Sequence, residues 1–258
     1  MPEKDFRIRR AAGLNDYFTC VDLQKKVWGY TQFEDIAAQP MLMISDRFGG
    51  NVLIAEDSAG VPIGFAFAMP GWKAGKRLFW WSHMTGVLLE HRGKDIGLAL
   101  KLRQRDEAIA AGIDLIEWTF DPLQSLNAHF NLNKLGVVVR EYEDNVYGNS
   151  SSALHRGLPT DRFVAEWHLK ESRPEVVDAK GASRILEGGN PPNLALEDDA
   201  LLMEIPVDLE ALKKTDPEAT LRWQTHLRAA SHHYFERGYA VTGFSRPFYV
   251  LRVLGTGH

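Results

Sequence analysis

The chain has 258 residues, of which 45% are hydrophobic and 25% charged, and its formal net charge at pH 7 is −4. This length and composition predict a globular protein with a sizeable core, as one large domain or as one domain with a smaller unit. The acidic balance, with a pI near 6.1, argues against a nucleic-acid binder that works by bulk electrostatics. The single cysteine, Cys20, excludes an internal disulfide framework and a cysteine cluster for structural zinc.

The opening segment, MPEKDFRIRR, is charged and lacks the apolar stretch of a signal peptide. No apolar run approaches the length needed to span a bilayer, and VPIGFAFAMPG is broken by Pro62 and Pro70. We therefore expect a cytoplasmic protein with neither a membrane nor nucleic acid as a partner.

The first 170 residues carry alternating strand and helix signals, which are typical of a mixed α/β layer structure. In chain order the first elements are a strand at 6–11, helices within 13–29 and 40–48, a hairpin of strands at 51–57 and 63–70, and a strand at 77–89. They are followed by a helix at 96–111, a strand at 113–122, a short helix near 124–135, and strands at 137–143 and 162–169. Residues 1–170 are therefore predicted to form one domain.

The remaining residues, 171–258, are predicted to form a C-terminal αβ extension. Residues 171–200 have little periodicity and read as a linker. A strand at 200–206, a helix at 217–237 and strands at 239–246 and 248–253 are expected after it. A helix–glycine–strand–proline unit ends at Pro122 and again at Pro247, so a diverged internal repeat is one interpretation. We prefer an extension that packs on the first domain, as part of an acceptor wall or as a homodimer contact.

The segment EHRGKDIGLAL (90–100) has the features of a diphosphate site. A strand that ends in a glycine-containing turn directs several backbone N–H groups at one point, and the following helix adds the positive end of its dipole. Arg92 and Lys94 add two cations. A glycine turn before a helix is often only a turn, so this pattern becomes informative only through its position after the strand at 77–89.

The run Arg92-Gly93-Lys94-Asp95-Ile96-Gly97 after TGVLL, together with NAHFNLNKLG (127–136), resembles the two motifs of the GCN5-related N-acetyltransferase (GNAT) superfamily. The likeness covers residues 6 to about 148, and more loosely to 169, and is similar to a branch of predicted acetyltransferases. It implies a mixed-sheet acyl-CoA N-acyltransferase fold and acetyl-CoA or coenzyme A as the acyl donor. By the same resemblance the cofactor-binding positions are Val87, Leu88, Leu89, Arg92, Gly93, Lys94, Asp95, Ile96, Gly97, Leu98, Asn127 and Lys134.

Within that set, the resemblance gives backbone roles to Val87 and Leu88, which would contact the pantetheine arm and the thioester carbonyl. Leu89 stands where many family members carry proline. Asp95 stands where the family favours glycine; aspartate tolerates unusual φ angles, and its side chain could cap the helix at the N–H groups of residues 96–98. A carboxylate beside a diphosphate predicts weakened coenzyme A binding.

The candidate catalytic residues are His83, His129 and Tyr142. Acyl transfer to an amine needs a base, and His83 lies where many family members place a carboxylate; its ordinary pKa near 6.5 suits the task. The alternative is a histidine that only hydrogen-bonds inside an aromatic-rich strand. The family's tyrosine acid falls on Leu132, which cannot donate a proton, so His129, Tyr142 and Tyr147 are the substitutes, each with a structural role as the alternative.

Other polar and aromatic residues carry two interpretations each. Asp121 could bind a cationic amine or serve the turn before Pro122. The aromatic residues that could line an acceptor pocket, or form core, are Trp28, Tyr30, Trp72, Trp80 and Trp81. His232 and His233 are adjacent on a helix and make a poor metal pair, so no metal is expected.

Together these residues predict a coenzyme A-dependent N-acyltransferase that acts on a small-molecule amine or a peptide. Three alternatives stay open: a non-catalytic acyl-CoA sensor, an acyltransferase with a non-amine acceptor, and a structural protein without a ligand.

Overall fold

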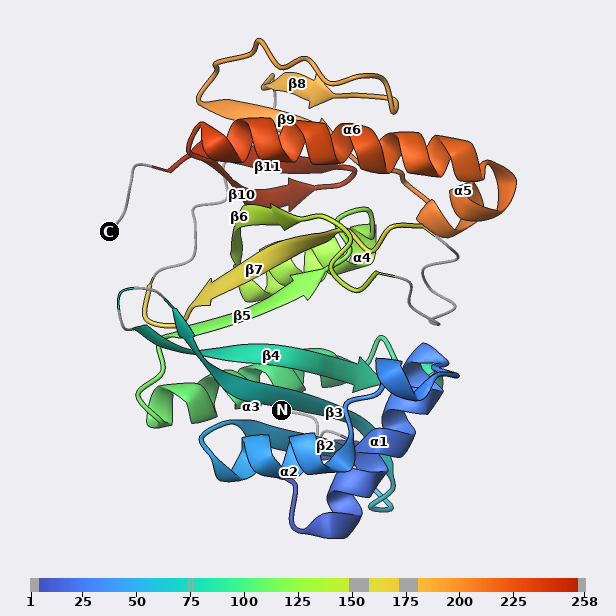
Figure 1. Cartoon of the computed structure of the whole chain (residues 1–258), viewed down its shortest axis with the longest axis vertical. Helices are drawn as coiled ribbons and strands as arrows, with labels where there is room; N and C mark the ends of the chain where they lie inside the picture. The colour runs from blue at the N-terminus through green and yellow to red at the C-terminus, as the bar shows by residue number, and fades with distance from the viewer. Residues whose placement is uncertain (1–4, 74, 76, 149–157, 172–180, 255–258) are drawn as a thin grey trace. The chain divides into compact units, whose positions relative to one another are not determined.

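The computed structural model describes residues 5–73, 75, 77–148, 158–171 and 181–254, and these form two compact units (Figure 1). The first unit holds the described residues up to Trp118 together with His168–Lys170, and the second holds the others from Thr119 onward. The domain boundary expected after residue 170 from the sequence stays a prediction.

The first unit is built on a mixed sheet. Its strands, in spatial order, are β1 (Phe6–Arg10), β2 (Asn51–Asp57), β3 (Pro62–Lys73), β4 (Arg77–Val87) and the start of β5 (Leu115–Phe120). The first four are antiparallel neighbours, whereas β5 runs parallel to β4. A parallel pair needs a crossover, and α3 (Ile96–Ala110) supplies it. The predicted strand at 77–89 ends earlier, at Val87, and is followed by a short 3-10 turn, Leu89–His91.

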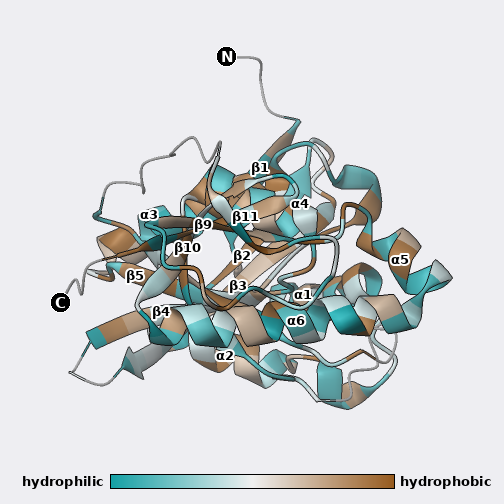
Figure 2. Ribbon diagram, turned by 90° about the horizontal axis from the view of Figure 1, so that it is seen from above, coloured by the Kyte–Doolittle hydropathy of each residue, from teal (hydrophilic) through white to brown (hydrophobic). Residues whose placement is uncertain are grey.

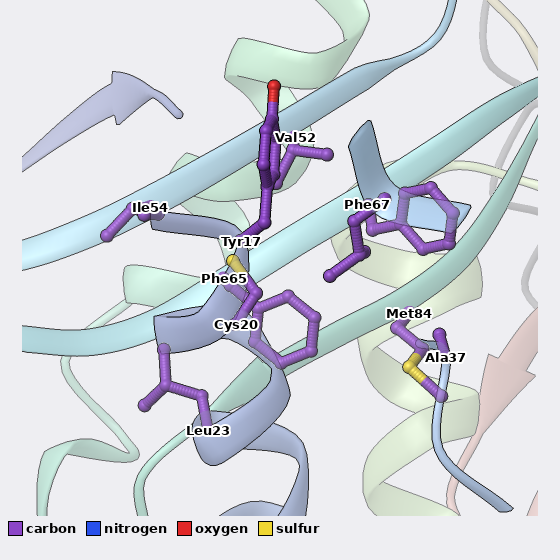
Figure 3. Packing of buried hydrophobic residues seen from close by; sticks show 10 residues of the cluster. Tyr17, Cys20, Leu23, Ala37, Val52, Ile54, Phe65, Phe67 and Met84 are labelled. Atoms are coloured by element: carbon purple, nitrogen blue, oxygen red, sulfur yellow. The ribbon is translucent and has the colours of Figure 1, made fainter. Parts of the chain in front are cut away.

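Helices cover both faces of this sheet, because the central strands β2 and β3 carry apolar side chains on both faces. On one face, α1 (Leu14–Trp28) packs Tyr17, Cys20 and Leu23 against alternate residues of the strands, with α2 (Gln39–Arg47) beside it (Figure 3). The strand residues of that cluster are Val52, Ile54, Phe65, Phe67 and Met84. On the other face, Leu53 and Ala55 contact a cluster that includes Ile96 and Leu100 of α3. The period of two along β2 therefore divides the core between α1 and α3.

The second unit also consists of strands covered by helices. Its strands follow the order β7 (Arg162–His168), β6 (Val138–Glu143), β10 (Tyr239–Ser245), β11 (Phe248–Val253), β9 (Ala200–Glu204), β8 (Ser183–Leu186). The C-terminal strands join β6 through Val241, which pairs with Val139.

The long helix α6 (Pro217–Glu236) covers this sheet and is amphipathic. It begins after Asp216, whose side chain accepts a hydrogen bond from the Ala219 N–H at 2.8 Å. Its buried positions, including Thr220, Leu227 and Tyr234, recur every three or four residues. Figure 2 accordingly shows hydrophilic and hydrophobic residues mixed along α6.

Two local predictions were wrong. The expected linker at 171–200 contains β8, a four-residue strand that is too short to show a period. A helix, α5 (Leu209–Thr215), lies before α6 where none was predicted. The predicted short helix at 124–135 is confirmed in extent, although only its first turn, α4 (Ser125–Ala128), is α-helical and the rest, His129–Leu135, labelled η3, is π-helical. None of the helices formed by the described residues is long and apolar enough to cross a membrane.

Candidate functional site

The strands β4 and β5 pair over a short stretch and then part. In the described chain their ladder consists of Trp80 with Ile116 and Trp81 with Glu117. Beyond that point β4 continues to Val87, paired with β3 only. We call the point where the ladder ends the fork, and the side of Ser82–Val87 that faces away from β3 the open edge.

Backbone groups on the open edge follow from the register. The Leu88 N–H donates to Ile63 O at 2.9 Å, so Leu88 points toward β3, and the alternate residues Val87 and Thr85 direct their backbone groups to the open edge. The Leu88 carbonyl also has a partner, since it accepts from His91 N, and the backbone role of Leu88 stays a prediction. The role of Val87 likewise stays a prediction; its carbonyl accepts a hydrogen bond from Arg92 Nε at 3.1 Å.

The open edge leads directly into the glycine loop, which we define as Leu88–Asp95. Two of its residues have left-handed backbone, Gly93 with φ 79° and Asp95 with φ 56°. The expected tolerance of Asp95 for this conformation is confirmed, whereas its expected capping role is wrong: no side-chain hydrogen bond caps α3. The backbone N–H groups of the first turn, which begins at Ile96, have no partner within the helix and are directed out of its N-terminus.

Open space lies above the start of α3. A Cβ atom added at Gly97 would meet nothing within 4 Å, and Gly97 does not have positive φ. The chain itself therefore gives no reason for glycine here, although alanine favours a helix by about 1 kcal/mol. Arg92 and Lys94 are exposed beside this space, as is Leu89, while Leu98 is half-buried. The arrangement can accept an anionic group that approaches the backbone closely.

His83 lies in an irregular part of β4, at the fork end of the open edge. Phe67 of β3 pairs with Met84 and Met69 with Trp81, so Ser82 and His83 together oppose the single residue between them on β3. This is a β-bulge on β4, which redirects side chains locally. The His83 ring is half-buried, with its centroid 5.8 Å from that of Phe67 at 81°. Burial lowers the pKa of His83 from its ordinary value, so the ring is neutral at pH 7 and able to accept a proton.

Lys101 is a buried residue that sequence reasoning missed. It lies on the inner face of α3 and its side chain is 3% exposed. Its Nζ donates to Ser82 Oγ at 2.7 Å and lies 3.6 Å from the centroid of the Trp118 ring. Burial lowers the pKa of Lys101 well below its ordinary value. The sequence gives no signal for it beyond its place next to Leu100 in the predicted helix at 96–111; the burial of Leu100 and Gln104 on the same face is known only from the structure.

Tyr142 lies in the second unit and is engaged by a buried carboxylate. Its hydroxyl donates to Asp161 Oδ2 at 2.7 Å, and Arg228 binds both oxygens of Asp161 at 2.7 to 2.9 Å. Burial first, and then the Asp161 carboxylate, raise the pKa of Tyr142. A hydroxyl held in this way is a poor proton donor to a substrate, which favours the structural alternative for Tyr142.

The other candidates of the second unit have local partners or lie exposed. Tyr147 hydrogen-bonds Thr119 at 2.9 Å, and His129 contacts Asn133 at 3.1 Å. Asn127, His129 and Lys134 are exposed, whereas Leu132 is 4% exposed and fills core. The turn role of Asp121 is supported, because its side chain accepts from Leu123 N at 2.9 Å.

The predicted aromatic pocket separates into different environments. Trp28 and Tyr30 stack with ring centroids 6.0 Å apart, and the Trp28 ring covers Gly86 on β4, where an added Cβ would lie 2.8 Å from it. Trp80 is core, with its indole N–H on Gly49 O at 2.8 Å, and Trp72 is 65% exposed. Of these residues, Trp28 lies against β4 at Gly86, with Tyr30 stacked on it, and the half-buried Trp81 is the β4 residue that pairs with Glu117 at the fork.

Solved structures with this arrangement are numerous, although no protein-family model and no curated protein sequence matches the chain. One is the NatC complex bound to Gag peptide and CoA, with a TM-score of 0.51 and 14% identity over 64% of this chain and 98% of that one. Another is yncA of Salmonella typhimurium with its cofactor acetyl-CoA, at 0.50 and 19% over 67% and 99%. A third is a GNAT-family protein of Desulfovibrio desulfuricans, at 0.50 and 15% over 64% and 99%. The chain therefore has the GNAT fold that its sequence predicted.

Proposed function

We propose that the protein is a coenzyme A-dependent acyltransferase that transfers an acetyl group from acetyl-CoA to an amine. The observation that carries this proposal is the open edge of β4, which runs from the fork to a glycine loop and a helix N-terminus with open space above Gly97. Two solved structures with the same fold contain CoA or acetyl-CoA.

The residues of the first unit fit the parts of such a donor. The N–H groups at the start of α3 and the cations Arg92 and Lys94 suit a diphosphate. The backbone groups of Val87 and Thr85 suit the amide-containing arm, because an extended chain that lies along an open strand edge can pair with it. The Val87 carbonyl must first be released by Arg92, which holds it at 3.1 Å.

The chemistry assigned to the chain's own residues is limited to proton removal and charge stabilisation. Bound acetyl-CoA would supply the thioester whose C–S bond breaks as the C–N bond to the amine forms. His83 is neutral at pH 7 and takes the proton that the attacking ammonium must lose. Backbone N–H groups of the open edge donate to the carbonyl oxygen as negative charge develops there. The second proton that the nitrogen loses as the amide forms passes through water to the departing thiolate, since Leu132 stands where the family's tyrosine acid falls.

A second candidate function is a non-catalytic acyl-CoA sensor. It is favoured by Leu132, which is buried and has no ionisable proton to donate, and by Asp95, whose carboxylate follows the turn proposed to bind the diphosphate. The sensor and the enzyme share the binding site and differ only in turnover.

The experiment combines calorimetric binding of coenzyme A with thiol release from acetyl-CoA over a panel of small amines and peptide N-termini. We expect binding and turnover in the wild type. Gly97→Leu should abolish binding while the protein stays folded, because its side chain fills the open space. Ala110→Leu, on an exposed position in the last turn of the same helix, is the matched control and should bind normally. Binding without turnover on any acceptor would favour the sensor, and no binding would defeat both functions.

A further inference from the structure

The fork between β4 and β5 is held from one side by a single lysine. Trp81 and Glu117 form the last described pair of the ladder, so Ser82 and Trp118 are the next residues on the two strands. Lys101 contacts both of them: its Nζ donates to Ser82 Oγ at 2.7 Å and lies 3.6 Å from the Trp118 ring centroid. Lys101 therefore joins β4 to β5 at the point where their backbone hydrogen bonds end.

Ser82 is also the first residue of the β-bulge that carries His83. Within the bulge, two residues of β4 oppose one residue of β3, so the ladder to β3 is locally disrupted. On the other side the ladder to β5 has already ended. The backbone hydrogen bonds of the sheet therefore constrain the orientation of Ser82 and His83 less than that of residues with a register partner. The hydrogen bond from Lys101 supplies a fixed point in this segment.

Stability does not explain a lysine at this position. Lys101 is 3% exposed, and its partners are a neutral hydroxyl and an aromatic ring. The neighbouring inner positions of α3, Ile96 and Leu100, carry aliphatic residues that pack in the core. Burying an amino group costs free energy, and an apolar residue of similar length would avoid that cost.

We propose that Lys101 is a positioning residue, which fixes the fork and the bulge at Ser82 and thereby the direction in which His83 faces the open edge. This inference rests on the proposed function for its catalytic consequence, but the structural part concerns the free protein. Lys101 acts through Ser82 and does not touch the reacting atoms.

The first test is hydrogen–deuterium exchange of the free protein, which needs no ligand. Lys101→Met keeps the aliphatic stem and removes the donor, so amide exchange in the β4 segment that contains Ser82 and His83 should become faster. Gln104→Leu is the matched control: Gln104 is buried on the same helix and hydrogen-bonds Asn51 of β2, away from the fork. It should leave exchange in that segment unchanged. Equal exchange in Lys101→Met and the wild type would overturn the proposal.

The second test separates positioning from packing. Lys101→Met and Ser82→Ala should each lower kcat by about tenfold or more with the Kd for coenzyme A unchanged, since small misplacements of a reacting group cost roughly 100-fold. The double variant should lose no more than either single one, because both remove the same hydrogen bond. Additive losses, or a kcat that Lys101→Met leaves intact, would overturn the proposal.

Two further outcomes are distinct. Acetylation of Lys101 itself, detected by mass spectrometry after incubation with acetyl-CoA, would make it an acceptor and would also overturn the positioning role. If the wild type binds no coenzyme A, the proposed function fails, while the exchange experiment still decides what Lys101 does to the fork.

Discussion

Asp95 should weaken the binding of a diphosphate, and two substitutions separate the reasons. Its backbone lies in the left-handed region at φ 56° and ψ 17°, and it is exposed. Asp95→Asn removes the charge and keeps a residue type that tolerates this conformation. Asp95→Gly removes the charge and also the left-handed strain, at the cost of a more flexible unfolded chain.

The electrostatic part can be estimated from the position of Asp95 at the surface. At a separation of roughly 7 Å and the dielectric of water, a carboxylate repels each phosphate charge by about 0.6 kcal/mol. Two phosphate charges give about 1.2 kcal/mol, or roughly sevenfold in Kd at low salt. Screening over a Debye length of about 8 Å reduces the effect to roughly twofold at physiological ionic strength.

Calorimetric titration of coenzyme A into the wild type, Asp95→Asn and Asp95→Gly, at low and at physiological salt, measures this. We expect both variants to bind more tightly, with a gain that shrinks as salt rises. The free energy of unfolding should change by less than about 1 kcal/mol in either variant. Weaker binding by Asp95→Asn would refute the reasoning, because it would mean that the carboxylate makes a favourable interaction with the ligand or with the loop in its bound form.

Three other predictions follow from the described contacts. His83→Gln should lower kcat with coenzyme A affinity kept. The wild-type kcat/KM should rise with pH through a midpoint below the ordinary histidine value of about 6.5, since burial lowers the pKa of His83. A variant with full turnover would exclude the base. The free energy of unfolding of the wild type, measured in urea relative to Lys101→Met, should increase as pH rises toward the ordinary lysine pKa near 10.4, by at most about 1.4 kcal/mol per pH unit. The reason is that the lowered pKa of Lys101 in the folded protein makes the unfolded chain bind more protons. A difference that does not depend on pH would contradict this. Tyr142→Phe should lower the free energy of unfolding by about 1 to 3 kcal/mol, since it removes a hydrogen bond to a buried carboxylate, and should leave kcat unchanged; a loss of kcat at unchanged stability would make Tyr142 catalytic.

The sequence predicted those features that depend on neighbouring residues. The strand that ends near Val87, the turn at Gly93 and the helix after Asp95 follow from local residue types, and the structure confirms them. The fold followed from the resemblance. Asp95 as a helix cap was wrong because its left-handed backbone, which the residue type permits, is not the extended conformation that a capping side chain usually accompanies.

Features that depend on register could not be predicted in this way. The contact of Lys101 with Ser82 and Trp118 requires knowing where a parallel ladder ends, and the paired residues Trp81 and Glu117 are far apart in the chain. The bulge at Ser82 and His83 is likewise defined only against β3. The π-helical segment of η3 adds a residue to a turn, which no apolar period reveals.

The open edge of β4 has a consequence for the free protein. Ser82–Val87 has β3 on one side and no β5 partner in the described ladder on the other, so it resembles the edge strand of a sheet while lying inside the strand order. Unpaired strand edges are templates for association with other chains, and proteins usually cover, shorten or charge them. The Arg92 side chain on the Val87 carbonyl partly does so at one end. A ligand that lies along this edge would complete the sheet as a missing strand does, and would protect the chain from self-association as well as present a substrate.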